Sequence, residues 1–295
     1  MSQEGGMSQE GGMNQEGGHY YVPAPSTWPI TGSIALLFMG FGAAFSVNRL
    51  PLGYGLLAAG FAVLIYMIFG WFGTVARESE GGVYNKQVDK SFRWGMSWFI
   101  FSEVMFFAVF FGALFYLRIH SILDLSSLEG RRLWPNFTGE WPTAGPGITE
   151  KFMPMGPWGL PTVNTLILLT SGVTVTWAHW ALKLNKRGQL KLGLLLTFLL
   201  GFLFVGLQAY EYAHAYSDLN LKLTTGVYGA TFFMLTGFHG FHVTLGSIML
   251  LVIWFRVLAG HFTPEHHFGF EGVAWYWHFV DVVWLGLFIF VYWLI

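Results

Sequence analysis

Residues 92–117 read FRWGMSWFIFSEVMFFAVFFGALFYL, an apolar run long enough to cross a bilayer as one helix. At about 1.5 Å rise per residue, the run covers the roughly 30 Å of hydrocarbon that a transmembrane helix must span. Glu103 is its only acidic residue, and no basic residue follows Arg93. The stretch therefore predicts a membrane helix with Glu103 about 16 Å from its start, close to the middle of the bilayer.

Six further apolar runs have the length of a membrane span. They cover residues 30–47, 53–75, 162–184, 190–212, 228–255 and 273–294. None alternates apolar and polar residues with period two, as the strands of a membrane barrel would. The sequence thus predicts an all-α, polytopic membrane protein with seven transmembrane helices. The short connection 48–52 predicts a tight hairpin, and residues 118–161 predict a long loop outside the bilayer.

The composition agrees with a membrane protein and excludes several functions. Hydrophobic residues make up 54% of the 295 residues and charged residues only 11%, against roughly 25% charged in soluble domains. The net charge of -1 provides no basic surface for nucleic acid, and the absence of cysteine excludes disulfides and thiolate metal sites. Residues 1–18 are three acidic, glycine-rich hexapeptides, which predict a disordered tail before a membrane domain at 19–295.

The basic residues predict an orientation. With seven spans the two termini lie on opposite sides, and nine of the 15 Lys and Arg residues fall on the side of the N-terminus. The positive-inside rule then places the N-terminus in the cytoplasm and the C-terminus in the periplasm, as in a bacterial inner membrane or an equivalent energy-transducing membrane. The nine are Arg77, Lys86, Lys90, Arg93, Lys183, Lys186, Arg187, Lys191 and Arg256.

Glu103 is the most informative polar residue in the predicted spans. Its neighbours at helical spacing are phenylalanines, so its own helix offers no charge partner. An ionised carboxylate there would cost several kcal/mol, which predicts a largely neutral side chain unless water or another helix reaches it. Two interpretations remain open: a proton-responsive carboxyl, or a protonated acid that joins two helices by a hydrogen bond.

Three histidines and one aspartate complete the predicted buried polar set. His239 and His242 lie three residues apart on one helix face, where they either ligate a metal or haem or form hydrogen bonds between helices. On the last helix, His278 and Asp281 are also three apart, which allows them to pair. We expect that pair in the cytoplasmic third of its span, and hydrogen-bonded rather than metal-bound histidines.

Five stretches resemble subunit III of cytochrome c oxidase, the accessory subunit of haem-copper terminal oxidases. The likeness extends from about His19 to Ile295, and the acid of SEVMFF in the family corresponds to Glu103. The stretches are PSTWPITG (25–32), FRWGMSWFIFSEVMFF (92–107), LPTVNTLILLTSGVTVTWAHWAL (160–182), GVYGATFFMLTGFHGFHV (226–243) and HHFGFEGVAWYWHFVDVVWLGLFIFVYWLI (266–295).

The resemblance implies a non-redox core subunit of an aerobic respiratory oxidase. It implies that haem and copper lie in partner subunits, that this chain packs against subunit I in a complex with subunit II, and that cytochrome c supplies electrons. It further implies support of proton uptake and phospholipid bound in a V-shaped cleft between the first two helices and the other five. The lipid head-group residues would be Arg77, Glu78, Arg256 and His261.

Other functions predict different features. Subunit III-like proteins of quinol oxidases and nitric oxide reductases typically have five spans, whereas seven are predicted here. An autonomous haem protein would use His239, His242 and His278. A secondary transporter would carry inverted repeats and broken helices, and the seven predicted spans do not match one another in that way.

Overall fold

The computed structural model describes residues 22–148 and 150–295. Within these residues the chain is helical and has no β-strand, and seven helical segments are long and apolar enough to cross a membrane. The predicted all-α fold with seven spans is confirmed. The predicted tail at residues 1–18 lies outside the described residues.

Short connections join the long helices, except for the long segment between the third and fourth of them. Pro29 and Pro161 each lie in the first turn of a helix, where the missing N–H costs nothing. The long helices are α1 (Trp28–Val47), α2 (Leu52–Glu80), α3 (Lys86–Tyr116), α6 (Leu160–Lys183), α7 (Arg187–Ser217), α8 (Val227–Leu258) and α9 (Phe268–Leu287), which a π-helical segment, η2 (Phe288–Trp293), extends.

The third span is longer than predicted. After α3 the chain continues as a π-helical turn, η1 (Leu117–Ser121), and as α4 (Ile122–Ser126), so the loop expected from residue 118 begins later. Apolar residues still recur at helical spacing here, and no Pro or Gly intervenes. The helix stops where Ser127 turns extended and accepts a hydrogen bond from the Gly130 N–H, capping the short α5 (Leu128–Leu133).

The first two helices form the predicted hairpin. Arg49 has a φ of 59° in the turn, and buried Gly42 and Gly60 let α1 and α2 approach closely. A Cβ at Gly42 would lie 2.9 Å from Leu57 Cγ, and one at Gly60 would lie 2.6 Å from Met39 Cγ. Small residues at such a crossing let the two backbones pack without a cavity.

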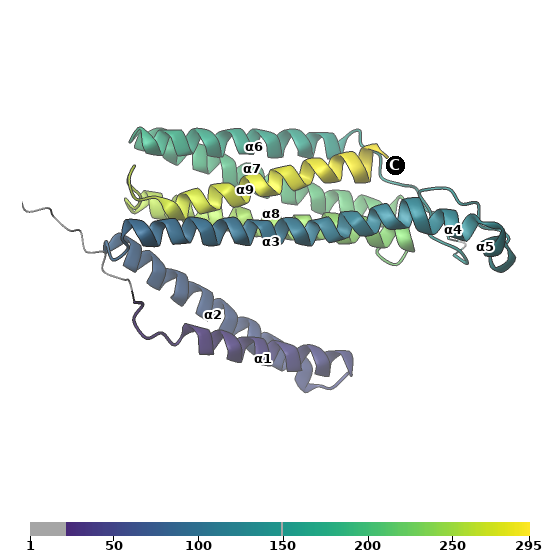
Figure 1. Ribbon diagram of the computed structural model, residues 1–295, viewed down its shortest axis with the longest axis horizontal. Coiled ribbons are helices and arrows are strands. Elements are labelled where there is room, and N and C mark those ends of the chain that lie inside the picture. Colours follow the sequence, from purple (N-terminus) through teal and green to yellow (C-terminus); the bar gives the residue numbers. More distant parts are fainter. Residues whose placement is uncertain (1–21, 149) are drawn as a thin grey trace, which may run out of the picture. The chain divides into compact units, whose positions relative to one another are not determined.

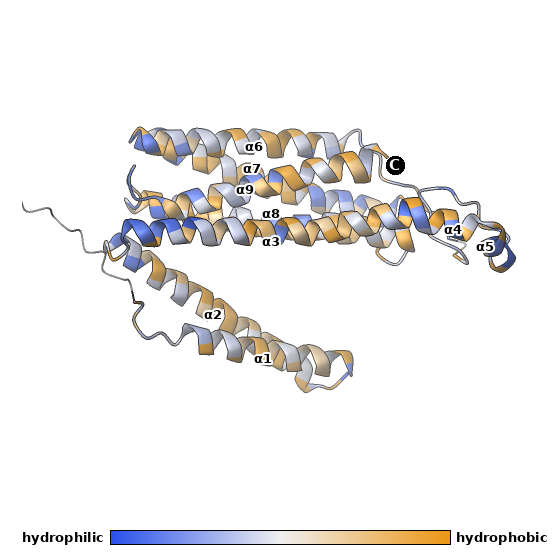
Figure 2. Ribbon diagram, viewed as in Figure 1, coloured by the Kyte–Doolittle hydropathy of each residue, from blue (hydrophilic) through white to orange (hydrophobic). Residues whose placement is uncertain are grey.

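The chain divides into two compact units. One contains α1 and α2 and ends at Val88; the other runs from Asp89 to Ile295. In the second unit α3 and α6 to α9 run alongside one another (Figure 1). Hydrophobic residues fill the middle of the helices, and hydrophilic ones gather at the start of α3 and at α5 (Figure 2). The V-shaped arrangement of the two units stays a prediction.

Trp277 lies at the centre of the second unit. Its side chain on α9 is fully buried, and its Nε1–H donates to Ser171 Oγ on α6 at 2.9 Å. The ring fits a slot where α7 and α8 have glycines: Cβ atoms at Gly201 and Gly246 would lie 2.7 and 2.8 Å from it. One aromatic residue thus joins four helices, which fixes the position of the polar groups on α8 and α9.

Candidate proton site and polar contacts

Glu103 and His242 meet between α3 and α8. His242 Nε2 lies 2.9 Å from Glu103 Oε2, and the two side chains are 9% and 24% exposed. Both residues lie near the centre of their helical segments, Lys86–Ser126 and Val227–Leu258. The partner that α3 cannot supply to Glu103 comes from α8, 139 residues away in sequence.

The hydrogen bonds of His242 fix its tautomer. Its Nδ1 lies 2.6 Å from the carbonyl oxygen of Phe238, which can only accept, so Nδ1 carries a hydrogen. In a neutral imidazole, Nε2 is then an acceptor and Glu103 must be protonated to donate to it. In the charged alternative, imidazolium donates to carboxylate. Both forms hold one proton between Nε2 and Oε2, so the pair is a single proton site.

Aromatic rings enclose this site. The imidazole of His242 lies against Phe107 and Phe106, with centroids 5.0 and 6.1 Å away, and stacks on Tyr276 at 6.3 Å. These rings displace water from the pair and lower the local dielectric. An ion pair here would have to remove two charges from water, and that desolvation cost favours the neutral form of the pair.

His239 is fully buried on the same helix. Its Nε2–H donates to the carbonyl oxygen of Val280 on α9 at 3.2 Å, and its ring lies 5.1 Å from that of Trp284. His242 uses both ring nitrogens within the chain, whereas Nδ1 of His239 has no hydrogen-bond partner among the described residues. Within residues 22–148 and 150–295, no three His, Asp or Glu side chains come together as a metal site would require.

His278 and Asp281 lie close together, as their spacing predicts. His278 Nδ1 lies 3.6 Å from Asp281 Oδ2. The helical segment begins at Phe268 and ends at Trp293, and the place of the pair in the cytoplasmic third of the membrane stays a prediction. The prediction that His278 is buried is wrong: its side chain is 46% exposed, because α6 covers only one edge of the ring through Thr176.

Several buried polar contacts join helices at positions for which the sequence predicts no partner. Glu211 on α7 is fully buried and accepts a hydrogen bond from the Tyr292 hydroxyl at 2.9 Å. Gln208 donates to the carbonyl oxygen of Thr236 at 2.9 Å, and Tyr212 shares a hydrogen bond with the Thr236 hydroxyl at 2.7 Å. The sequence spacing of Gln208 and Glu211 indicates two polar residues on one helix face. It does not indicate their partners, Thr236 and Tyr292, because these lie on other helices.

One end of the second unit is held by ionic and polar contacts. Arg93 on α3 pairs with Asp89 at 3.0 Å and with Glu271 on α9. Arg187, at the start of α7, donates to the carbonyl oxygens of Gly260, His261 and Phe262 at 2.7 to 3.1 Å. The sequence shows these arginines only as charges, whereas the structure shows that they also hold helix ends together.

The predicted lipid residues fall into two local groups. In the first unit, Arg77 donates to Thr74 Oγ1 at 3.2 Å, and the hydroxyl of Tyr84 donates to Glu78 Oε2 at 2.6 Å. In the second, Arg256 donates to His261 Nδ1 at 3.2 Å and lies over the ring of Phe262. In each group, contacts within the same unit hold the side chains in place.

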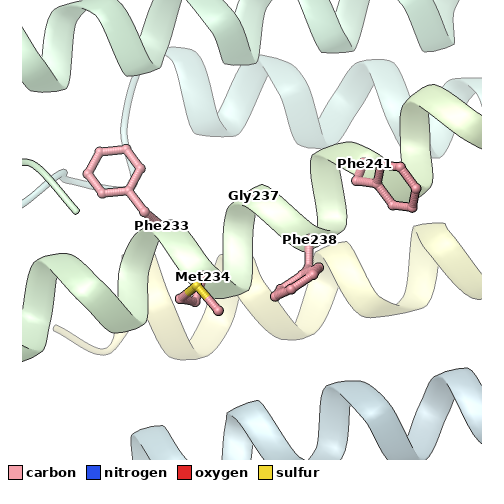
Figure 3. A pocket seen from close by; sticks show the side chains of 5 residues that line it. All are labelled: Phe233, Met234, Gly237, Phe238 and Phe241. Atoms are coloured by element: carbon pink, nitrogen blue, oxygen red, sulfur yellow. The ribbon is translucent and has the colours of Figure 1, made fainter. Parts of the chain in front are cut away.

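An apolar groove of about 360 Å³ opens on the outside of α8. Phe233, Phe238 and Phe241 project from the helix, and Gly237 leaves the gap between them (Figure 3). A smaller hollow of about 170 Å³ lies at the start of α3, lined by Lys90, Arg93, Trp94 and Ser97. The first is lined by apolar side chains, and the second has two basic side chains.

The family model of cytochrome c oxidase subunit III matches residues 18–295. The chain therefore belongs to the cytochrome c oxidase subunit III family. Among its relatives, cytochrome c oxidase subunit 3 of Marchantia polymorpha is 40% identical over 275 residues, covering 93% of this chain and 96% of the relative. The subunit 3 proteins of Tetraodon nigroviridis and Homo sapiens are 44% and 43% identical over 277 residues, with the same coverage.

Membership of the subunit III family indicates in which kind of complex these polar contacts lie. The chain is a multi-pass membrane protein and a component of an oxidase complex. Glu103 and His242 therefore form a hydrogen-bonded pair inside a subunit of an oxidase complex, and the helix-end arginines lie where a membrane surface is expected.

Proposed function

We propose that this subunit stabilises the catalytic subunit I of the oxidase and sustains its proton uptake. In this proposal haem and copper are held by partner subunits, subunit II completes the complex, and cytochrome c donates the electrons. The relatives named above, called cytochrome c oxidase subunit 3, support the choice over a quinol oxidase or nitric oxide reductase.

The contact between Glu103 and His242 is the observation that supports the proposed role in proton uptake. A carboxyl and an imidazole that share one proton at mid-helix need no counter-ion, so they persist in a low-dielectric setting. Partly exposed Glu103 can still exchange that proton when a partner helix or water reaches it. We infer that the pair tunes or buffers protonation next to subunit I, while the chain itself performs no redox step.

We also propose that phospholipid binds to this subunit. Arg77 and Glu78 in the first unit, and Arg256 and His261 in the second, lie at helix ends where head groups are expected. The groove at Phe238 offers an apolar surface for an acyl chain (Figure 3). The more numerous basic residues on the N-terminal side support a cytoplasmic N-terminus in a bacterial inner membrane or its equivalent.

The test compares the purified oxidase with and without this subunit. We expect electron transfer to start at a similar rate in both forms. Proton uptake should be slower, and the number of turnovers before inactivation lower, in the form that lacks the subunit. An unchanged working life over many turnovers would contradict the proposal. Glu103→Gln should leave assembly and haem content intact, which separates the proton site from the structural role.

A further inference from the structure

Glu211 is a buried acid that the proposed function does not use. It lies near the end of α7 and is fully buried. The hydroxyl of Tyr292, on η2, donates to its Oε1 at 2.9 Å, whereas its Oε2 has no hydrogen-bond partner among the described residues. Buried polar atoms in proteins nearly always bond to a protein group or to internal water. The unpaired Oε2 therefore indicates a further ligand.

The protonation state of Glu211 follows from its surroundings. The titratable side chains near Glu211 and its partner Tyr292 are Tyr228 of α8 and Tyr212 and His214 of α7. Of these only His214 can become a cation, and its side chain is 42% exposed to solvent. An ionised Glu211 would thus depend on a single hydroxyl donor away from water, at a cost of several kcal/mol. Glu211 is therefore protonated.

A second group of unpaired atoms lies on α6. Asn164 is fully buried, and neither its amide nitrogen nor its amide oxygen has a hydrogen-bond partner among the described residues. The short connection between α6 and α7 makes the two helices antiparallel, and Thr174 Oγ1 lies 2.8 Å from Thr197 Oγ1. Continuing this register by ten residues along each helix places Asn164 level with Leu207, one turn from Glu211.

Internal water is the ligand that fits these atoms. The Tyr292 hydroxyl donates to Oε1 of Glu211, so the carboxyl proton lies on Oε2 and needs an acceptor. The amide of Asn164 offers both donors and an acceptor within about one turn. A buried water forms about three hydrogen bonds and binds where polar groups are otherwise unsatisfied. A metal ion fits less well, because no three His, Asp or Glu side chains come together in the part of the chain that the structure describes.

A route to the surface begins one turn beyond Glu211. His214 follows three residues later on the same helix face and is partly exposed. Its Nδ1 lies 2.6 Å from Asp218 Oδ2, and a carboxylate can only accept, so Nδ1 carries a hydrogen. Nε2 of the neutral ring is then able to take up a proton. An exposed base thus lies one turn from the buried acid.

We propose that Glu211 is a second proton-binding carboxyl of this subunit, held protonated with internal water between its Oε2 and Asn164. It exchanges its proton with the aqueous phase at the end of the second unit where the chain terminates. The carboxyl gives its proton to the bound water, which passes one proton to His214 Nε2, and a carboxylate and an imidazolium result. This site is separate from the proposed role in proton uptake, because Glu103 lies at mid-helix and Glu211 near the end of its helix.

Infrared spectroscopy of the complete oxidase tests the protonated state, because the C=O group of a protonated carboxyl absorbs apart from carboxylates and amides. Glu211→Gln should remove one such band, and the control, Glu129→Gln at an exposed position, should remove none. Tyr292→Phe removes the donor to Oε1 and should shift the same band to higher frequency. Retention of all these bands in Glu211→Gln, or an unshifted spectrum of Tyr292→Phe should the Gln variant not assemble, would overturn the proposal.

Transfer to heavy water tests the exchange. The Glu211 band should shift to lower frequency as deuterium replaces the proton. His214→Gln should slow this shift, whereas His266→Gln should not, because it replaces an exposed histidine at the opposite end of the second unit. A Glu211 band that does not respond to heavy water, or that responds equally fast in His214→Gln, would overturn the proposal and leave the site at Glu103 unaffected.

Discussion

Replacing Glu103 by glutamine should keep its hydrogen bond to His242. Since His242 Nδ1–H donates to Phe238, Nε2 of the neutral ring accepts, and the amide of Gln can donate to it as the protonated acid does. We expect the free energy of unfolding of Glu103→Gln to stay within about 1 kcal/mol of the unsubstituted protein.

Glu103→Leu removes the donor and should cost more. The side chain of His242 is only 9% exposed, so its Nε2 would lose its partner without gaining water. Leaving such a group unsatisfied costs about 1–3 kcal/mol. The adjacent Ser102→Ala is the matched control, because Ser102 is exposed and donates only to the Phe99 carbonyl oxygen. We expect that control to change stability by no more than about 0.5 kcal/mol.

Denaturant titration of the purified protein in detergent, followed by tryptophan fluorescence, measures these differences. Adding His242→Phe to each variant should abolish the gap between Gln and Leu at position 103, since the acceptor is gone. A hydrophobic carbodiimide, which reacts with protonated carboxyls, should label Glu103 first. If Gln destabilises as much as Leu, and no label appears, the pair is carboxylate and imidazolium, and the neutral form is refuted.

Because the Trp277 ring fills the space beside Gly246, Gly246→Ala should destabilise the protein by about 1–3 kcal/mol through overpacking. Gly206 has open space beside it, so Gly206→Ala is the control and should not destabilise the protein in this way. Thermal unfolding in detergent compares the two variants. Outside the spans, the hydrogen bond from His214 lowers the pKa of Asp218 below its ordinary 3.8. The pair should therefore add a small, salt-sensitive stability that is present above pH 3.8 and lost as pH falls through the lower pKa; Asp218→Asn should abolish this pH dependence in acid unfolding curves.

The candidate site was predictable as a set of residues but not as contacts. Glu103 and His242 stand out because charged or polar residues are costly in apolar helices. Their pairing depends on the rotation of α3 against α8, which periodicity does not specify. The tautomer of His242 likewise follows from its contact with Phe238, a local helix feature that becomes informative only once Glu103 is opposite.

The mistaken burial of His278 has the same origin. Polarity and position indicate that a histidine in a span is buried, but exposure depends on which neighbours cover that helix face. Here α6 contacts His278 through Thr176 and approaches its Nδ1 at Gly172, where the absence of a side chain leaves room for Asp281. A Cβ at position 172 would overlap the Asp281 carboxylate.

The sequence by itself determined the number of spans, their helical state and the first hairpin. These follow from apolar length, because in lipid every backbone N–H and C=O must bond within its own helix. Only the tertiary structure decided which polar groups share protons and which face the surface. Trp277 between Gly201 and Gly246 fixes α9 against α7 and α8. The separate contact of α3 with α8 brings Glu103 to His242, and the packing of α6 against α9 leaves His278 exposed.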